Sequence, residues 1–326
     1  MERKSKENVY LPEGSLIDTD LNVMYTASLA MLERAMHRGR ILEAVATLCD
    51  CRDMSLRVDF GFAKGIIRRE DAHLSGEGAK DIAVITRVGK PVAFKVKQII
   101  QTGAEPVVLL SRRAAQEECL EAYASKLAAG DIVPCTVTHL DPFGAFVDIG
   151  CGIVSLICID SISVSRIFHP RDRLYPGQRI HAVVKSVDKE SGRMYMSLRE
   201  LLGTWEENAA EFAPCSSVAG VVRSIEDYGI FVELRPNLAG LAELRDGVSP
   251  GDSCSVYIKS IIPDRMKIKL VIIDSMKKPV VPALKYYVDT ESTRHISRWR
   301  YSPAECKKVI ETVFDEERCK AGSGQR

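Results

Sequence analysis

Hydrophobic and polar residues alternate in short runs along most of the chain, and Gly, Pro and Asp bound these runs. In the stretch "PFGAFVDIG" (142–150), Val147 and Ile149 fall on one face of an extended backbone, and Phe146 and Asp148 fall on the other. A period of two residues is typical of half-buried β-strands. Roughly five such runs in every 60–75 residues predict small closed β-barrels and a mainly β fold.

The alternating pattern recurs along the chain. "VTHLDPFGAFVDIG" (137–150) matches "VRSIEDYGIFVELR" (222–235) at an offset of 85 positions, and "YPGQRIHAVVKSV" (175–187) matches "SPGDSCSVYIKSI" (249–261) at an offset of 74. The later copy is therefore shorter by 11 residues, which fall in a polar connection near 161–175. A fainter copy includes "RVGKPVAFKVKQI" (87–99). All three share a Gly followed eight positions later by a Lys: Gly89/Lys97, Gly177/Lys185 and Gly251/Lys259.

These matches divide the chain into three barrel copies and the segments between them. The copies are expected at 38–113, 130–199 and 215–274. Segments 114–129 and 200–214 are rich in Ala, Glu and Leu and are predicted to be helical linkers, and 1–37 is expected to be an extension with a helix. In the tail, 275–326, the order Ser302-Pro303-Ala304-Glu305 has capping-box spacing and predicts a helix from about Pro303 to Asp315.

Each of the two later copies carries an aromatic-Gly-x-Phe motif, with Phe143 and Phe146 in one and Tyr228 and Phe231 in the other. Strict alternation would put the two rings of a pair on opposite faces, but a glycine between them permits a bulge or a tight bend. Both rings would then lie outside the barrel and form a platform on which nucleobases stack. The competing interpretation, in which the rings close the barrel core, is the commoner one for a single aromatic residue. Two copies in register favour the surface.

The combined pattern resembles the S1 domain, an RNA-binding module with the OB fold that occurs in the large ribosomal protein of the bacterial small subunit. The residues that carry the resemblance are "FGAFV" (143–147), "YGIFV" (228–232) and "GRMYMSL" (192–198). The stretch "LLGTWEENAAEF" (201–212) is similar to the helical linker that joins such modules. The resemblance implies tandem five-stranded OB barrels joined by short helices, with a C-terminal helix, in a short protein similar to ribosomal protein S1.

In this family, two aromatic residues, a His, an Asp and an Arg form the RNA-binding face. Transferred to the second copy, the resemblance implies that Phe143, Phe146, Asp188 and Arg193 contact RNA, while Cys158 stands at the His position. In the third copy it implies Tyr228, Phe231 and Lys267, with Glu243 at the His position and Pro263 at the Asp position. Lys185 and Lys259, from the shared Gly-Lys spacing, complete the expected RNA contacts.

The first copy departs furthest from this pattern. Aligned on "VDFG" (58–61), it has Met54 and Arg57 in place of the two rings and Ser55 in place of the glycine. A barrel without its stacking pair is expected to serve as a docking or structural module.

Net charge is only +1, so any basic surface must be local. The tail 275–326 holds 11 Lys and Arg against 7 Asp and Glu, and Arg298, Trp299 and Arg300 interleave charge with an aromatic ring. This composition suits contact with single-stranded RNA, and it equally suits a solvated, partly ordered tail. Binding is expected to favour single strands over duplex and to be sensitive to salt.

No catalytic or metal-binding motif stands out. The chain lacks a Walker A loop, an H-E-x-x-H motif, a G-x-S-x-G elbow and a C-x-x-C pair, although it contains ten cysteines. We therefore expect no enzyme activity, no cofactor and no metal. The first residues lack the apolar core of a signal peptide, and no apolar run is long enough to span a membrane, so a soluble cytoplasmic protein is expected.

Two functions from different classes remain. The first is binding of single-stranded RNA by a translation protein that holds messenger RNA at the small ribosomal subunit. The second is a protein-interaction scaffold that docks on the ribosome or on RNA-decay machinery, with incidental RNA contact. Cys158, Glu243 and the ring-free first copy favour the scaffold, whereas the paired rings and Arg193 favour RNA binding, which we prefer.

Overall fold

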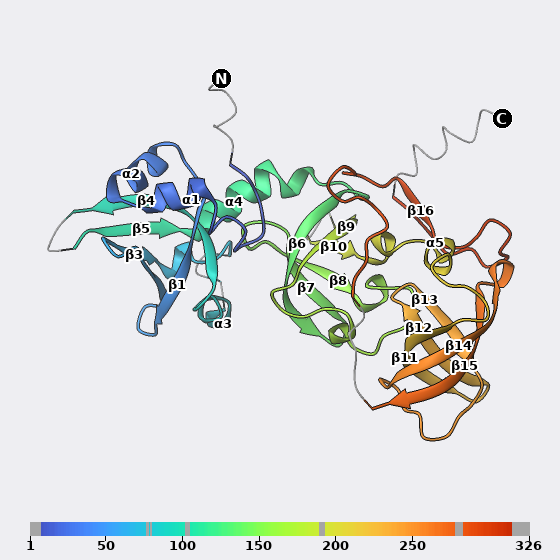
Figure 1. Ribbon diagram of the computed structural model, residues 1–326. Helices are drawn as coiled ribbons and strands as arrows, with labels where there is room; N and C mark the ends of the chain where they lie inside the picture. The colour runs from blue at the N-terminus through green and yellow to red at the C-terminus, as the bar shows by residue number, and fades with distance from the viewer. Residues whose placement is uncertain are drawn as a thin grey trace, which may run out of the picture. The chain divides into compact units, whose positions relative to one another are not determined.

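The computed structural model describes residues 8–75, 78, 80–101, 105–188, 193–277 and 283–314. It contains three closed five-stranded barrels and few helices (Figure 1). The chain divides into two compact units. One unit holds the chain up to Leu127 with two short pieces of the second barrel, Pro134–Thr136 and Asp148–Val154, and the other holds the rest of the second barrel, the third barrel and the C-terminal segment. The predicted series of β-barrels is confirmed.

The three barrels share one strand order. In each, the first three strands are neighbours in sequence order and the third strand pairs with the fifth. The fifth strand pairs with the fourth, and the fourth closes the barrel against the first. The strands of the first barrel are β1 (Leu42–Asp50), β2 (Ser55–Asp59), β3 (Lys64–Ile67), β4 (Pro91–Ile100) and β5 (Val107–Ser111). Those of the second are β6 (Ile132–Asp141), β7 (Gly144–Asp148), β8 (Val154–Cys158), β9 (Arg179–Val187) and β10 (Met194–Ser197). Those of the third are β11 (Ser217–Glu226), β12 (Gly229–Arg235), β13 (Leu238–Ala242), β14 (Ser253–Ile262) and β15 (Lys267–Met276).

Helices are short and lie before, between and within the barrels. The α-helices are α1 (Asp20–Thr26), α2 (Leu29–His37), α3 (Asp81–Ile85), α4 (Arg112–Ala122) and α5 (Trp205–Ala209). Single 3-10 turns are η1 (Arg69–Asp71), η3 (Ala124–Lys126), η4 (Ile159–Ser161), η5 (Pro170–Asp172), η6 (Arg199–Leu202) and η7 (Pro263–Arg265). Helix α4 begins earlier than the sequence suggested, because the Ser111 hydroxyl caps it by accepting the Ala114 N–H at 3.0 Å.

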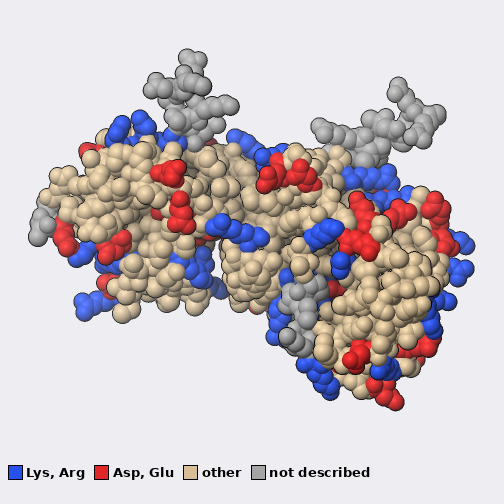
Figure 2. All heavy atoms as spheres, viewed as in Figure 1, with Lys and Arg blue, Asp and Glu red and all other residues tan. Residues whose placement is uncertain are grey.

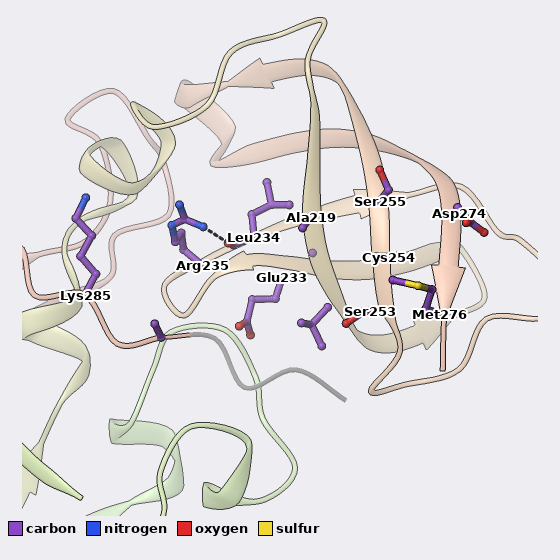
Figure 3. A pocket seen from close by; sticks show the side chains of 13 residues that line it. Ala219, Glu233, Leu234, Arg235, Ser253, Cys254, Ser255, Asp274, Met276 and Lys285 are labelled. Carbon is purple, nitrogen blue, oxygen red and sulfur yellow. Dashed lines mark hydrogen bonds between the residues drawn. The ribbon is translucent and has the colours of Figure 1, made fainter. Parts of the chain in front are cut away.

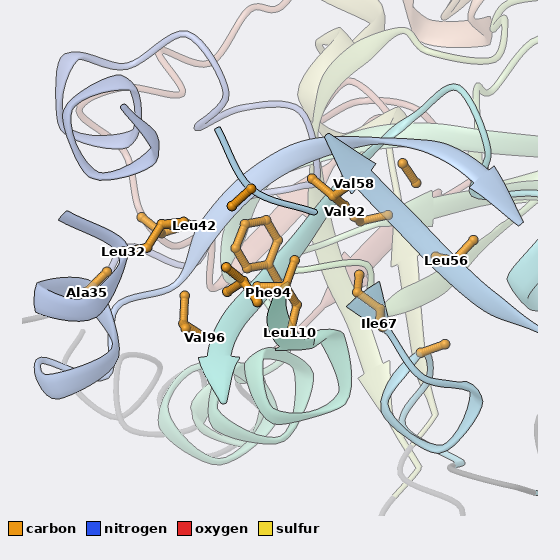
Figure 4. Close-up of a cluster of buried hydrophobic side chains, with 14 of the residues drawn as sticks. Leu32, Ala35, Leu42, Leu56, Val58, Ile67, Val92, Phe94, Val96 and Leu110 are labelled. Atoms are coloured by element: carbon orange, nitrogen blue, oxygen red, sulfur yellow. The ribbon is translucent and has the colours of Figure 1, made fainter. Parts of the chain in front are cut away.

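Inward-facing aliphatic residues fill the barrels, as the alternating pattern predicts. In the first barrel, Leu42, Leu56, Ile67 and Leu110 come from four different strands and surround Phe94 (Figure 4). Alternate residues of one strand therefore face the core, and their neighbours face outward. This alternation decides which side chains each barrel presents to a ligand.

The polar connection between β8 and β9 is bound to the third barrel by an ion pair and a hydrogen bond. Arg173 is fully buried and ion-pairs with Glu233 of β12, which also accepts two bonds from Arg223 of β11. The Val164 N–H donates to the Asn237 side-chain oxygen at 2.9 Å. The 11 extra residues of the second copy thus fasten it to the third barrel.

The predicted C-terminal helix is wrong where the chain is described. Between 303 and 314 the structure has no helix, and β16 (Arg298–Arg300) instead pairs antiparallel with β17 (Glu311–Val313). The Ser302 hydroxyl accepts the distant Ile310 N–H at 2.7 Å rather than capping a first turn. β-Branched residues at 309, 310, 312 and 313 favour the strand, since branching at Cβ restricts the side chain in a helix. Asp315 lies outside the described residues.

Candidate nucleic-acid interface

The ring pair of the second barrel lies on its outer surface. Phe143 immediately precedes β7 and is 55% exposed, while Phe146 within β7 is half-buried. Their ring centroids are 5.9 Å apart and the ring planes are perpendicular. The two rings therefore form one platform, with the exposed ring standing on edge against its neighbour.

The third barrel repeats this arrangement. Tyr228 immediately precedes β12 and is 69% exposed, Phe231 within β12 is half-buried, and the centroids are 6.1 Å apart with perpendicular planes. Because two separate copies have the same geometry, the aromatic-Gly-x-Phe motif itself determines the position of the rings.

The glycine between the rings permits a close approach of two strands. A Cβ added to Gly144 would lie 2.4 Å from the Ile157 carbonyl oxygen, and one added to Gly229 would lie 2.5 Å from the Ala242 oxygen. Gly229 also has a φ of 148°, which L-residues rarely adopt. The sequence predicted a bulge or a tight bend at this glycine. The structure shows that glycine is needed because a Cβ would clash with the carbonyl oxygen of the neighbouring strand.

A third ring joins the second-barrel platform, and the sequence did not reveal it. The His139 imidazole stacks on Phe146 with centroids 6.2 Å apart and planes inclined by 24°. Its Nε2 lies 3.0 Å from the Asp141 carboxylate. In the third copy, a register shift between Val222 and Ser224 places Ser224 opposite Phe231, and His139 holds the equivalent position 85 residues earlier. This shift breaks the two-residue alternation, so no periodicity signal was available.

The basic residues predicted for the second barrel lie on β9 and just before β10. Lys185 on β9 donates to the Ser161 hydroxyl at 2.9 Å, just after β8, where Cys158 occupies the expected His position and is half-buried. Asp188 and Arg193 are both exposed and are joined through the backbone, the Asp188 N–H donating to the Arg193 carbonyl at 2.8 Å. Asp188 directly follows β9, and Arg193 directly precedes β10.

On the third barrel, the corresponding lysine is already paired. The Lys259 ammonium donates to the Glu243 carboxylate at 2.8 Å, and this contact lowers the pKa of Glu243. Pro263, at the expected Asp position, begins the 3-10 turn η7. Lys267 is exposed at the start of β15. The third face thus keeps its rings and offers a partly neutralised basic border.

Among the described residues of the first barrel, no ring pair stands at the position equivalent to the two platforms. Met54 stands in the place of the leading ring, has a positive φ of 54° and is buried in the core. Arg57 stands in the place of the second ring and pairs with Asp50 at 3.4 Å. Neither side chain presents an aromatic face, so base stacking is absent from this position.

The expected tail contact through Trp299 is incompatible with the structure. Trp299 lies in β16, is only 7% exposed and belongs to the core of the third barrel, where Arg199 lies over its ring at 5.9 Å. A buried ring cannot stack on a base. Its neighbours are engaged as well: Arg298 pairs with Glu311 at 2.7 Å, and Arg300 donates to the carbonyls of Pro303 and Ala304. Burial of Trp299 thus corrects the predicted stacking, whereas RNA contact by Arg298 and Arg300 stays a prediction.

A cavity of about 650 Å³ opens on the third barrel (Figure 3). Its wall includes Ser253, at the start of β14, and Met276, at the end of β15, whereas Lys259 and Lys267 lie toward the opposite ends of these strands. The lining is mainly apolar, and Glu233 in its wall is bound to Arg173 and Arg223. No convergent set of polar groups identifies a ligand.

No group of three or more His, Cys, Asp or Glu side chains within the described ranges is arranged to hold a metal ion. Among the same residues, no helix combines the length and the apolar character needed to cross a bilayer.

Comparisons with known proteins agree with the geometry of the second barrel. Residues 126–199 match the family described as "S1 RNA binding domain", so this part of the chain is an S1 domain. The chain is 32% identical over 188 residues to the small ribosomal subunit protein bS1 of Leuconostoc lactis, covering 53% of this chain and 44% of that protein. It is 25% identical over 287 residues to bS1 of Staphylococcus aureus strain MRSA252, covering 83% and 69%.

The chain thus spans less than half of the first of these relatives and about two thirds of the second. Among solved structures, it is similar to GSP13 from Bacillus subtilis, with 26% identity, a TM-score of 0.22 and coverage of 27% of this chain and 62% of that protein.

Proposed function

We propose that this protein binds single-stranded RNA on the outer faces of its second and third barrels, and that it acts in translation as ribosomal protein S1 does, holding messenger RNA at the small ribosomal subunit. Phe143, Phe146, Tyr228 and Phe231 stack on bases. The other residues that we assign to RNA contact are Arg193, Lys185 and Asp188 in the second barrel and Lys259 and Lys267 in the third.

The repeated ring pair is the observation that carries the proposal. A ring that is more than half exposed on a folded domain leaves apolar surface in water, which favours a partner. Each nucleobase offers a flat face to such a ring, and stacking contributes about 1–3 kcal/mol per base. Bases inside a duplex are already stacked on each other, so the protein favours single strands.

The charge distribution sets the strength of binding. On the face seen in Figure 2, Lys and Arg side chains are interspersed with Asp and Glu and form no single basic field. With a net charge of +1, phosphate neutralisation comes from a few residues at the platforms. Affinity is therefore moderate, and stacking supplies much of it.

The ribosomal part of the proposal rests on the two bS1 relatives, whose names place them in the small ribosomal subunit. The first barrel, where Met54 is buried and Arg57 is paired, is assigned to docking rather than to RNA. We assign no catalytic step and no cofactor to any residue, and we place the protein in the cytoplasm, with the ribosome.

Fluorescence anisotropy of labelled RNA tests the proposal. A single-stranded oligonucleotide should bind, and the same sequence annealed to its complement should bind at least tenfold more weakly. Purified small ribosomal subunits should carry the protein through a sucrose cushion and retain more labelled messenger RNA with it than without it. Equal affinity for single strand and duplex would reject the stacking proposal, and co-sedimentation without RNA binding would support the scaffold function instead.

A further inference from the structure

A row of outward side chains crosses four strands of the second barrel. His139 on β6 stacks on Phe146 of β7. The Ile149 N–H donates to the Ile153 carbonyl and the Ile159 N–H donates to the Phe143 carbonyl, and this antiparallel register sets Phe146 opposite Leu156 of β8. Leu156 in turn pairs with Tyr195 of β10. We refer to these four residues, His139, Phe146, Leu156 and Tyr195, as the second-barrel row.

Tyr195 points outward by the same alternation that buries its neighbours. Met194 and Met196 on either side are buried in the barrel, while Tyr195 and its partner Leu156 are half-buried. Adjacent strands lie about 4.8 Å apart, so Tyr195 stands roughly 10 Å from Phe146, with Leu156 as an apolar floor between them. Aromatic side chains therefore stand on three of the four strands that the row crosses.

The third barrel has an equivalent row with different chemistry. The strand register pairs Ser224 with Phe231, Phe231 with Leu241, and Leu241 with Lys269. These four residues form the third-barrel row. The phenylalanine and the leucine are retained, but the two flanking rings are replaced by the hydroxyl of Ser224 and the exposed ammonium of Lys269.

This difference changes what each row recognises. An aromatic ring contributes stacking, which every base offers and which depends weakly on salt. An ammonium contributes phosphate neutralisation, which releases counterions and therefore weakens as salt rises. Neither His139, Tyr195 nor Lys269 belongs to the residues that the resemblance to S1 domains identified.

We propose that the two barrels divide the recognition of a single RNA strand between them. In the second barrel, His139 and Tyr195 extend the platform of Phe143 and Phe146, so that this barrel holds the bases. In the third barrel, Lys269 contacts the phosphate backbone beside Tyr228 and Phe231. This inference rests on the proposed binding of single-stranded RNA and assigns the longer base-stacking site to the second barrel.

Reciprocal substitutions test the division on the full chain. The dissociation constant for a labelled oligouridine is measured by anisotropy at several salt concentrations for the wild type, Tyr195→Lys and Lys269→Tyr. For single strands, the slope of log affinity against log salt changes by about 0.7 per phosphate contact. We expect Tyr195→Lys to steepen the slope by about 0.7 and to weaken binding at high salt, and Lys269→Tyr to flatten it by about 0.7.

Truncations of the added rings test stacking directly. His139→Ala and Tyr195→Leu should each weaken binding about fivefold or more at high salt, where phosphate contacts contribute least. Tyr195→Phe keeps a ring on the same strand and should bind within twofold of the wild type. Because leucine also suits a half-buried strand position, Tyr195→Leu tests the ring without unfolding the barrel, and thermal melting verifies this.

The outcomes separate the inference from the function beneath it. If the wild type binds RNA and loses affinity when Phe143 and Phe146 are replaced, yet the variants at 139, 195 and 269 keep the wild-type slope and affinity, only the division of labour is wrong. If the wild type binds no single-stranded RNA at low salt, the proposed function and this inference both fail.

Discussion

Gly144 shows how one residue type determines the geometry of the ring pair. The Ile157 carbonyl lies so close that a methyl group at Gly144 would be 2.4 Å from its oxygen. Gly144→Ala must therefore push β8 away from β7 and displace Phe143. We expect the free energy of unfolding to fall by about 1–3 kcal/mol, as overpacked sites do, and RNA affinity to fall with it.

Urea denaturation followed by circular dichroism measures this loss. Gly78→Ala is the matched control, because no atom lies within 4 Å of the position of its added Cβ. The control should change the free energy of unfolding by less than about 0.5 kcal/mol. Equal, small effects at both positions would show that the strands are not held at this distance.

Glu43 gives a prediction about pH. Its carboxylate is buried in β1 and accepts the N–H groups of Gly14 and Leu16 at 3.0 and 2.9 Å, and burial raises its pKa to about 7 from the ordinary value of 4.5. Between these two values the folded chain holds a proton that the unfolded chain releases. The free energy of unfolding should therefore decrease as pH rises from about 4.5 to about 7.

Replacing the carboxyl isolates this contribution from other titrating groups. Glu43→Gln keeps an accepting oxygen but cannot ionise. As pH rises from 5 to 7.5, the free energy of unfolding of the variant minus that of the wild type should therefore increase, because only the wild type loses this contribution. Thermal melts of both proteins across this range give the comparison. A constant difference between the two proteins at all pH values would contradict the raised pKa.

At the scale of single residues, the sequence identified the outward-facing side chains that belong to a short repeated motif. It missed outward-facing side chains whose position depends on the strand register. Phe143, Phe146, Tyr228 and Phe231 follow from the repeated motif. The sequence did not reveal His139: at the equivalent place in the third barrel, a register shift between Val222 and Ser224 reverses which alternate residues face outward, and such a shift leaves no periodic signal. Tyr195 follows alternation with Arg193 and was within reach of the same reasoning.

At the scale of elements, the C-terminal segment replaces an expected helix and an expected RNA contact with a structural β-hairpin. Trp299 fills the third barrel's core and Tyr301 beside it donates its hydroxyl to the Asn237 carbonyl. Trp299→Ala should lower the free energy of unfolding by about 3–5 kcal/mol, as for other buried aromatic residues. The folded fraction should bind RNA as tightly as the wild type.

Denaturant titration and anisotropy on the same samples separate the two effects. Val309→Ala is the control, since Val309 is exposed in the same segment and its loss should change stability by less than about 0.5 kcal/mol. Loss of RNA affinity in folded Trp299→Ala, with stability unchanged, would restore the tail as a binding element.

The element-scale predictions differ in accuracy for a physical reason. Barrel strands could be predicted because alternation, glycine and turn residues agree within each copy. The segment from 298 to 314 has capping-box spacing but β-branched residues, and its strand pairing with residues a dozen positions away decides the outcome. The local sequence does not show whether a helix cap or pairing with a distant strand is the more stable arrangement.

At the scale of the molecule, a buried ion triad joins the second and third barrels. Glu233 accepts from Arg173 of the connection before β9 and from Arg223 of β11, and all three side chains are almost inaccessible. Removing this carboxylate leaves the two buried guanidinium groups with only the half-buried Asp172, which lies 3.8 Å from Arg223. We expect Glu233→Gln to lower the free energy of unfolding by about 3–5 kcal/mol.

A surface pair on the same barrel provides the comparison. Asp264 and Arg265 are both mostly exposed, at 3.8 Å, so Asp264→Asn should cost less than about 1 kcal/mol. Urea denaturation of the two variants gives both values. If Glu233→Gln were as mild as the control, the connection between β8 and β9 would not be a structural fastening. In the sequence this connection is only a polar segment of variable length, and its composition gives no sign of the contact with a distant copy.

The most direct test of RNA binding compares the wild type with the double variant Phe143→Ala and Phe146→Ala, which removes the second-barrel platform. Anisotropy of a short labelled single-stranded RNA gives both affinities, and circular dichroism verifies that the variant is folded. Val154→Ala, an exposed residue at the start of β8, is the matched control. Loss of two stacking rings predicts about 2 kcal/mol or more, roughly a 30-fold weaker complex, with the control unchanged. A folded double variant that binds as tightly as the wild type would show that this face does not hold RNA.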